Sequence, residues 1–520
     1  MSWIMRSLVR NAQLYPQRAA LVAEDATLTY SVLVRRVASA AAEMQRCGVL
    51  DGEITAIALR RGTPQIIAAL AAMWLGSPFA IVDLDEAPER RRAQVRASLA
   101  TRLVVEQGAD AAYAAEGVPT LRISTSGDTG PGPELAWPDD DDVAYVVFTS
   151  GTTGVPKSVA VPHRALGNYS RFLSSVLDQV RPAGAPLSCA SVTSFATDLG
   201  HTAIFPALVS GDTVHLVDKP TMMDPLAFGS YMRAHSVDVL KSTASHMSAH
   251  LDHGARDVLP RTLMIFGGEP LSWDLVDQVA QNGTCRVLNH YGPSETTIGV
   301  LTYPVDPRRQ EHRSSAHVPL GKPIDGVSVE VVGEELRAVP PGETGELLVW
   351  GECVALGYLG ARDATRARFV TLPSWLRSSG GGAQPVVAYR TGDTVRRLAS
   401  GDIEFLGRND RQVKINGQRI ELGEVEAALR RCPDVRNAVV VHHSGTGLSA
   451  FVVPADPASP PDTKSLRSRL REELSVSAIP RVITVLDHIP LTLSGKLDAT
   501  KLALVGDRAS SVIPIRRGVN

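Results

Sequence analysis

Short apolar and β-branched runs alternate with amphipathic segments of helical length over the first four-fifths of the chain. The strand-like runs include AYVVFTS (144–150), DTVHLVD (212–218), DVLKSTA (238–244), TLMIFGG (262–268) and CRVLNHYG (285–292). Helical patterns such as DLVDQVAQ (274–281) lie between them. This alternation predicts βαβ units with largely parallel sheets covered by helices. Because such sheets bind their ligands at the carboxyl ends of the strands, we expect the functional residues where these runs end.

The pattern changes after GELLVWG (345–351). Residues 400–432 indicate a hairpin, a tight turn, another strand and an amphipathic helix, and two strands (435–445, 448–456) and a helix (462–474) follow. The predicted fold class is α/β, with a large N-terminal domain of parallel-rich sheets sandwiched by helices and a small α+β C-terminal domain. We expect the boundary near Arg408 to Asp410, which divides the chain into domains of 1–408 and 409–505 and a tail of 506–520.

The composition is that of a globular protein with a full core, with 44% hydrophobic and 21% charged residues in a chain of 520. The formal net charge of −2 argues against a dedicated nucleic-acid binder, which needs a basic face for the phosphates. A run of arginines is expected to be the solvated face of a helix: Arg90, Arg91, Arg92 and Arg96. Segments rich in Gly, Ser and Pro at 126–133 and 378–385 are expected to be surface loops.

Nothing in the sequence indicates secretion or a membrane span. The N-terminus lacks the features of a signal peptide, and the five cysteines are scattered without a Cys-x-x-Cys pair. The most apolar stretch, residues 66–82, is interrupted by Gly76 and Pro78, so we expect a buried helix followed by a strand. These features predict a cytoplasmic protein with reduced thiols.

The strand-like run at 144–150 leads into SGTTGVPK (150–157), a loop of small residues followed by a lysine. Such a loop offers backbone N–H groups and hydroxyls to phosphate oxygens with little steric bulk, and Lys157 adds a positive charge. The spacing differs from that of the common phosphate-binding loop. Taken alone, the segment fits a small-residue turn with a solvated lysine equally well.

Four further stretches carry polar residues in the same order along the chain: NHYGPSETT (289–297), YRTGD (389–393), GRNDRQVKINGQRIELGEVE (407–426) and LTLSGKLD (491–498). With the loop at 150–157, they closely resemble the adenylate-forming superfamily, and specifically the amino-acid adenylation domains of nonribosomal peptide assembly. The resemblance extends from about Thr27 to Asp498.

The resemblance implies an enzyme that activates a carboxylate with Mg-ATP, releases pyrophosphate and passes the acyl group to a thiol. The resemblance implies that ATP is bound by Thr149, Ser150, Gly151, Thr152, Thr153, Gly154, Lys157, Gly267, Gly268, Glu269, Asn289, Tyr291, Gly292, Ser294, Thr296, Asp393 and Arg408.

Several of these residues match family positions with particular roles. Tyr291 is expected to stack on adenine, Asp393 to bind the ribose hydroxyls with support from Arg408, and Glu295 to hold Mg²⁺. For Asp393 and Arg408 the alternative is a surface ion pair.

Two further matches concern the small C-terminal domain. Lys496 corresponds to the lysine that stabilises negative charge as the carboxylate attacks the α-phosphate; its alternative is a solvated loop lysine. Asp410 corresponds to the hinge about which the small, mobile domain turns between the two half-reactions.

The family's substrate pocket can be assigned position by position. Its wall consists of Asp198, Leu199, Thr202, Lys241, Ile265, Gly267, His290, Ile298 and Gly299, with Lys496 closing it. Asp198 stands where the family keeps the carboxylate that pairs with an α-ammonium group.

Lys241 interrupts an apolar strand, and a buried lysine is costly unless it meets an anion. With His290 it resembles the family's aspartate-type pocket, whereas asparagine pockets typically have an acid at the position of His290. The alternative is that Lys241 reaches solvent or pairs with a protein carboxylate. A 3-substituted aspartate such as 3-methylaspartate would present the same charges, and Gly267 and Gly299 are expected to leave room for its methyl group.

No carrier-protein or condensation motif follows the last match in the sequence, so a free-standing enzyme is expected, with a separate carrier protein or a small thiol as acceptor. A requirement for a small activator protein is left open. Two alternatives remain: an acyl-CoA ligase, which would not need Asp198, and a non-catalytic binding protein of the same fold, which should have lost Lys496, Glu295 or Asp393. Neither a nucleic acid nor a membrane is expected as a partner.

Overall fold

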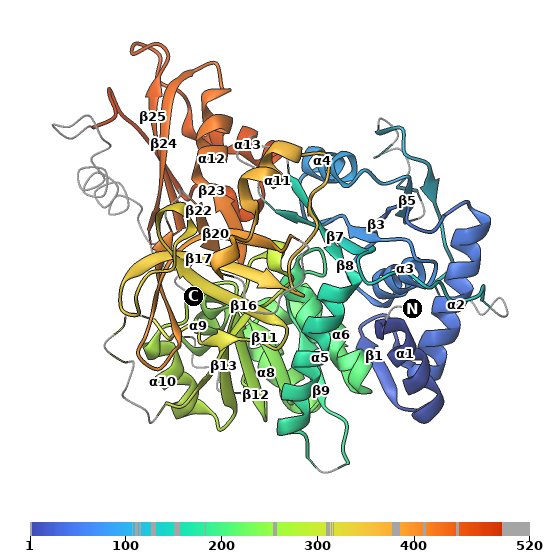
Figure 1. The fold of residues 1–520 in the computed structure, drawn as a ribbon. Coiled ribbons are helices and arrows are strands. Elements are labelled where there is room, and N and C mark those ends of the chain that lie inside the picture. Colours follow the sequence, from blue (N-terminus) through green and yellow to red (C-terminus); the bar gives the residue numbers. More distant parts are fainter. Residues whose placement is uncertain are drawn as a thin grey trace, which may run out of the picture. The chain divides into compact units, whose positions relative to one another are not determined.

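The computed structural model describes residues 3–106, 108–109, 113, 116–125, 132–149, 156–182, 184–252, 257–307, 313, 315, 317–376, 385–408, 412–443 and 447–490 (Figure 1). The chain divides into two compact units. The first contains residues 1–84, 94–149 and 157–410, and the second contains 85–93, 150–156 and 411–520. Most of the two loops expected at 126–133 and 378–385, and the whole tail at 506–520, lie outside the described residues.

A nine-stranded sheet forms one side of the first unit. Its strand order is β15 (Lys322–Pro323), β14 (Leu301–Val305), β13 (Arg286–Tyr291), β12 (Leu263–Gly267), β11 (Val239–Ser242), β9 (Ser188–Ser191), β10 (Thr213–Leu216), β1 (Ala19–Ala23) and β2 (Thr27–Thr29). The strands from β13 to β1 are parallel, and the strands at both edges are antiparallel. Every strand-like run predicted within this sheet is a strand, which confirms the expected parallel-rich architecture.

A second large sheet has seven strands. Its order is β18 (Gly357–Tyr358), β8 (Lys157–Pro162), β7 (Val143–Thr149), β4 (Phe79–Ile81), β3 (Thr55–Ala58), β5 (Arg102–Val105) and β6 (Thr120–Leu121). The strands from β7 to β6 are parallel, whereas β8 and β18 are antiparallel.

A layer of helices packs between these two sheets. Helices α1 (Trp3–Leu14), α2 (Tyr30–Arg46) and α6 (Asp198–Ser210) belong to the side of the nine-stranded sheet, and α3 (Thr63–Trp74) and α5 (His163–Val180) to the side of the seven-stranded sheet. The two groups meet where α2 contacts α3 and α5 contacts α6. Helix α3 is buried on nearly all sides, as its uniformly apolar sequence requires. The buried helix and following strand expected at 66–82 are thus α3 and β4.

The remaining helices of the first unit are shorter. They are α7 (Lys219–Met223), α8 (Pro225–Ala234), α9 (Ala244–Asp252), α10 (Trp273–Asn282) and α11 (Arg362–Arg368). No described helix has the length and apolar content that a membrane crossing needs.

The first unit also contains an antiparallel sheet that was not predicted as a separate layer. Its strands are β16 (Val327–Val332), β17 (Thr344–Gly351), β20 (Val387–Arg397), β19 (Phe369–Thr371) and β21 (Ile403–Arg408), with β21 paired to β20. This pairing places Asp393 opposite Arg408.

The second unit is an α+β structure with its own apolar core. The hairpin of β22 (Gln412–Ile415) and β23 (Gln418–Glu421) leads into α12 (Leu422–Arg430). The strands β24 (Val435–His443), β25 (Gly447–Pro454) and β26 (Val482–Val485) form a second sheet, and α13 (Thr463–Glu473) packs on α12. All of these elements except β26 were expected from the sequence.

The arginine run forms part of α4 (Pro88–Ser98), but Arg90 does not lie on a solvated face. Its side chain is only 10% exposed and lies 3.5 Å from Glu86 and 3.3 Å from Glu424, two residues of the same compact unit. The expectation of a wholly solvated basic face was therefore wrong at this position, because two carboxylates compensate the buried charge.

Candidate functional site

Three neighbouring parallel strands bring the expected pocket residues together. Lys241 of β11 is paired with Ile265 of β12. Gly267, at the end of β12, is paired with His290 of β13. These residues thus gather toward the carboxyl ends of their strands, the edge at which parallel sheets bind ligands.

Lys241 is buried in this wall and contacts His290. The residue is 1% exposed, which excludes the alternative that its ammonium group reaches solvent. Its Nζ lies 2.9 Å from His290 Nδ1. An ammonium group can only donate, so Nδ1 accepts and the neutral imidazole carries its proton on Nε2. A cavity of about 10 Å³, with room for about one water, adjoins Lys241 and Thr202, so the surroundings of this cation are closely packed.

Two glycines make this arrangement possible. A Cβ on Gly267 would lie 2.3 Å from Lys241 Nζ, and a Cβ on Gly299 would lie 1.8 Å from His290 Nε2. Real Cβ atoms do not approach other atoms this closely. The space above both glycines is therefore filled by Lys241 and His290. This corrects the expectation that the two glycines leave room for a methyl group of the substrate.

The backbone is strained where it leads into the last part of the wall. Thr297 and Ile298 have φ values of 60° and 65°, which β-branched residues rarely adopt. The turn is held by hydrogen bonds from Gly299 N to Thr297 O (2.7 Å) and from Thr297 Oγ1 to Cys353 O (2.8 Å). Strain of this kind costs about 1–3 kcal/mol per residue and is concentrated at functional sites. The residue types of Thr297 and Ile298 do not predict this strained backbone.

Asp198 is the first residue of α6 and is 7% exposed. Burial, and then the Asp198 carboxylate, raise the pKa of Tyr145, and both also raise the pKa of Tyr169. The Tyr169 hydroxyl donates to Thr202 Oγ1 over 3.2 Å, and its ring meets the His290 ring edge-on with centroids 5.6 Å apart. Tyr169, which the sequence did not single out, therefore neighbours both the acidic and the basic ends of the pocket.

A second group of residues forms around Asp393. The Tyr291 hydroxyl donates to one carboxylate oxygen, and Arg408 Nη1 donates to the other. Arg408 also donates to Thr391 O over 3.0 Å. Asp393 is 2% exposed, so the pair with Arg408 is buried and not a surface ion pair. Burial and the Asp393 carboxylate raise the pKa of Tyr291, which keeps its hydroxyl protonated as a donor. A carboxylate accepts about four hydrogen bonds, so Asp393 can accept more.

Glu295 is held by a tyrosine of β18, Tyr358. Glu295 is 1% exposed, and its Oε1 accepts a hydrogen bond of 2.6 Å from the Tyr358 hydroxyl. Lys157 Nζ lies 5.4 Å from the centroid of the Tyr358 ring. Tyr358 thus contacts a buried carboxylate through its hydroxyl and a cation through its ring. Tyr358 was not among the site residues expected from the sequence.

Three of the expected ATP residues use their side chains to hold the backbone around the site. Glu269 accepts from Ser245 N (2.9 Å) and Ser245 Oγ (3.0 Å) beside the start of α9. Asn289 donates to Pro319 O over 2.8 Å, and Thr296 donates to Pro293 O over 3.0 Å.

The structure also describes four other residues that were expected in the site. Ser294 begins a 3₁₀ turn (Ser294–Thr296), and Gly268 has a φ of 84°, which favours glycine. A Cβ on Gly292 would lie 2.6 Å from the Cα of Gly299, so a larger residue would displace the pocket wall. Leu199 follows Asp198 in α6 and is half-buried.

Thr149 ends β7 and is paired with Lys157, the first residue of β8. The loop residues Ser150, Gly151, Thr152, Thr153 and Gly154 lie outside the described residues. Asp410 and Lys496 also lie outside them, so their roles remain predictions from the sequence.

Two family descriptions match this chain. Residues 8–359 match the AMP-binding enzyme family, and residues 424–496 match the AMP-binding enzyme C-terminal domain. The first match covers more than half of the chain.

Curated relatives and solved structures agree with these matches. The chain is 33% identical over 511 residues to surfactin synthase subunit 2 of Bacillus subtilis, covering 95% of this chain and 14% of that protein. It is 32% identical over 487 residues to the isonitrile lipopeptide synthase of Mycobacterium tuberculosis, covering 93% of this chain and 18% of that protein.

The chain therefore spans less than a fifth of the length of these two relatives. Its fold is similar to that of an NRPS protein containing adenylation and PCP domains, with a TM-score of 0.83 and 23% identity over 96% of this chain and 84% of that one. The chain belongs to the AMP-binding enzyme family.

Proposed function

We propose that this chain is an adenylation domain and an AMP-forming ligase. It activates an acidic amino acid, L-aspartate, to its aminoacyl-AMP and then transfers it to the phosphopantetheine thiol of a carrier protein. The observation that carries the choice of substrate is the buried Lys241 ammonium beside His290. Removing an ammonium group from water costs several kcal/mol unless an anion compensates it. The side-chain carboxylate of aspartate would be that anion.

The donors in this wall also favour a carboxylate over an amide. Lys241 has three donors and no acceptor, and the Nδ1 acceptor of His290 is already used by Lys241. An asparagine side chain would bring an NH₂ group to groups that can only donate, and an unsatisfied buried donor costs about 1–3 kcal/mol. Aspartate accepts from both residues. At the other end of the substrate, Asp198 would pair with the α-ammonium group.

The residues around the nucleotide support the same reaction. Tyr291 would stack on the adenine, and Asp393, oriented by Arg408, would accept from the ribose hydroxyls. Lys157 would act on the phosphates as a point charge, and Lys496 would stabilise the charge that develops at the α-phosphate. Asp410 would be the hinge between adenylation and thiol transfer.

The donor set around Glu295 fits Mg²⁺. This ion binds through one or two carboxylates together with substrate phosphates, so a cage of protein ligands is not needed. Among the described residues no group of three or more His, Cys, Asp or Glu side chains forms a metal site. Glu295 would hold the ion, which when bound neutralises phosphate charge. Tyr358 would orient the carboxylate through its hydrogen bond.

Pyrophosphate exchange with each of the twenty amino acids and 3-methylaspartate tests this proposal. We expect the highest kcat/KM for aspartate, lower values for asparagine, and no exchange without Mg²⁺. Because His290 and Lys241 fill the space above the two glycines, we expect 3-methylaspartate to be no better than aspartate. A preference for a neutral side chain would overturn the assignment of an acidic substrate.

Tyr358→Phe is expected to lower Mg²⁺ affinity or activity by about 10- to 100-fold, the usual cost of losing a partner that orients a metal ligand. The ring and its contacts remain, and only the hydroxyl that donates to Glu295 is removed. Exchange rates measured against Mg²⁺ concentration check this result. An unchanged Mg²⁺ dependence would show that the hydrogen bond has no role in the site.

Gly299→Ala is expected to reduce the preference for aspartate over asparagine. The new Cβ would collide with the imidazole of His290 and force it away from its present contact with Lys241. Overpacking of this kind costs about 1–3 kcal/mol of folding stability. The ratio of kcat/KM values for aspartate and asparagine, together with the melting temperature, checks the prediction. A variant that melts earlier but keeps the full ratio would contradict it.

A further inference from the structure

Arg61, in the loop after β3, binds three backbone carbonyls at the strand ends of the other large sheet. Its Nε donates to Val217 O over 3.0 Å, its Nη1 to Thr193 O over 2.5 Å, and its Nη2 to Ser191 O over 2.5 Å. Ser191 is the last residue of β9, and Val217 follows β10 directly. One guanidinium group therefore holds together the carboxyl ends of β9 and β10 and the segment that follows β9.

The chain that leaves β9 leads to Asp198. It runs from residue 192 to the start of α6, and its geometry decides where the Asp198 carboxylate lies. A second polar contact fastens it: Ser194 Oγ donates over 3.0 Å to Asp83 Oδ2, and Asp83 follows β4 by two residues. Ser194 O accepts from Thr197 Oγ1 over 2.9 Å, which closes the turn before Asp198. Both anchors thus come from loops of the seven-stranded sheet.

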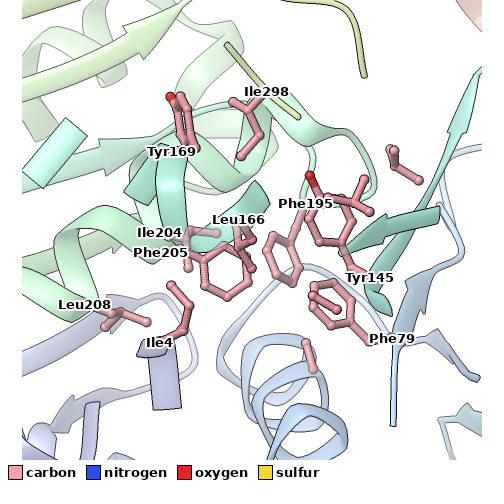
Figure 2. Close-up of a cluster of buried hydrophobic side chains, with 14 of the residues drawn as sticks. Ile4, Phe79, Tyr145, Leu166, Tyr169, Phe195, Ile204, Phe205, Leu208 and Ile298 are labelled. Atoms are coloured by element: carbon pink, nitrogen blue, oxygen red, sulfur yellow. The ribbon is translucent and has the colours of Figure 1, made fainter. Parts of the chain in front are cut away.

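Aromatic side chains of the core also pack against the same segment. Phe195 stacks on Phe79 with centroids 5.7 Å apart, and His201 Nε2 lies 3.1 Å from Phe195 O. Burial lowers the pKa of His201 to about 3, so the ring is neutral and packs against Tyr145 as one more aromatic group. Figure 2 shows Phe79, Tyr145 and Phe195 gathered in this cluster. The cluster fixes the backbone only at Phe195, through His201, whereas Arg61 binds the carbonyls of Ser191 and Thr193 that come before it.

We propose that Arg61 is a positioning residue that sets the location of Asp198 and hence the affinity for the α-ammonium group of the substrate. The inference rests on the proposed function of Asp198 as that partner. A guanidinium group suits the task because its donors point in fixed directions within one plane. A lysine would keep the charge but could not hold three carbonyls in that plane.

The test compares Arg61→Lys and Arg61→Met with a matched control, Arg18→Lys. Arg18 also donates to a backbone carbonyl, Gly211 O at 2.8 Å, but at the opposite end of α6. For both Arg61 variants we expect the KM for aspartate to rise by about tenfold or more, since small displacements of a binding group have effects of this size, while the KM for ATP stays nearly constant. Arg18→Lys is expected to leave both constants unchanged even if it lowers the melting temperature.

Combination with Asp198→Ala separates the two hypotheses. If Arg61 acts through Asp198, the double variant Arg61→Lys/Asp198→Ala should have the same KM for aspartate as Asp198→Ala alone. An Asp198→Ala variant with an unchanged amino-acid KM would refute the proposed role of Asp198. A raised KM in Asp198→Ala, but not in Arg61→Lys and Arg61→Met, would overturn only the inference about Arg61. Additive increases of the KM in the double variant would also overturn the inference about Arg61.

Discussion

Lys241→Ala is expected to lower kcat/KM for aspartate by about 10²- to 10³-fold or more, because the substrate carboxylate would remain desolvated in the pocket without its cation. Breaking a buried pair by removing one partner costs about 3–5 kcal/mol. Neutral amino acids do not use this contact, so their weak activity should persist or increase. The variant should therefore lose its selectivity and not its ability to form adenylates.

Two further variants make the result specific. Lys241→Met keeps most of the side-chain volume and should behave like Lys241→Ala, because the charge and not the space is lost. Asp198→Ala should weaken every α-amino acid, since all of them share the ammonium group. Pyrophosphate exchange with aspartate, 3-methylaspartate, asparagine and alanine distinguishes these patterns. A Lys241→Ala enzyme that still prefers aspartate would show that another group recognises the side chain.

The parallel part of the fold could be predicted because each buried strand is a short apolar run bounded by polar or small residues. Runs such as 262–268 and 285–292 became β12 and β13 within one or two residues. The strand β26 was missed because VITV (482–485) is four residues long and carries no periodicity that separates a strand from a helical turn. The antiparallel sheet of β16, β17, β19, β20 and β21 was missed as a layer because the pairing of β17 with β20 joins strands that β18, α11 and β19 separate in the sequence.

The pocket residues could be assigned from spacing along the chain, but their contacts could not. The family resemblance identified Lys241 and His290, yet only the pairing of β11, β12 and β13 brings their side chains to 2.9 Å. Tyr358 and Arg61 were missed because they act through partners 63 and at least 130 residues away in sequence. Their residue types alone do not indicate such roles.

Lys496→Ala is expected to slow formation of the aminoacyl-adenylate by about 10²-fold or more, the effect typical of losing one preorganised charge stabiliser. As the substrate carboxylate attacks the α-phosphate, negative charge increases on the phosphate oxygens. A positioned ammonium group stabilises this charge more in the transition state than in the ground state, so its loss lowers kcat more than it raises KM. Transfer of the acyl group from a preformed adenylate to the thiol breaks a bond that is already activated, and should be much less affected.

Single-turnover measurements of the two half-reactions decide whether Lys496 has this role. Lys501→Ala serves as the matched control, since it removes a lysine five positions further along the same segment and should leave both rates unchanged. Lys496→Arg tests whether the charge alone is sufficient; because a guanidinium group is larger and planar, we expect only partial activity. Equal losses in both half-reactions of Lys496→Ala would indicate a general disturbance of the C-terminal domain, and would contradict a role confined to adenylation.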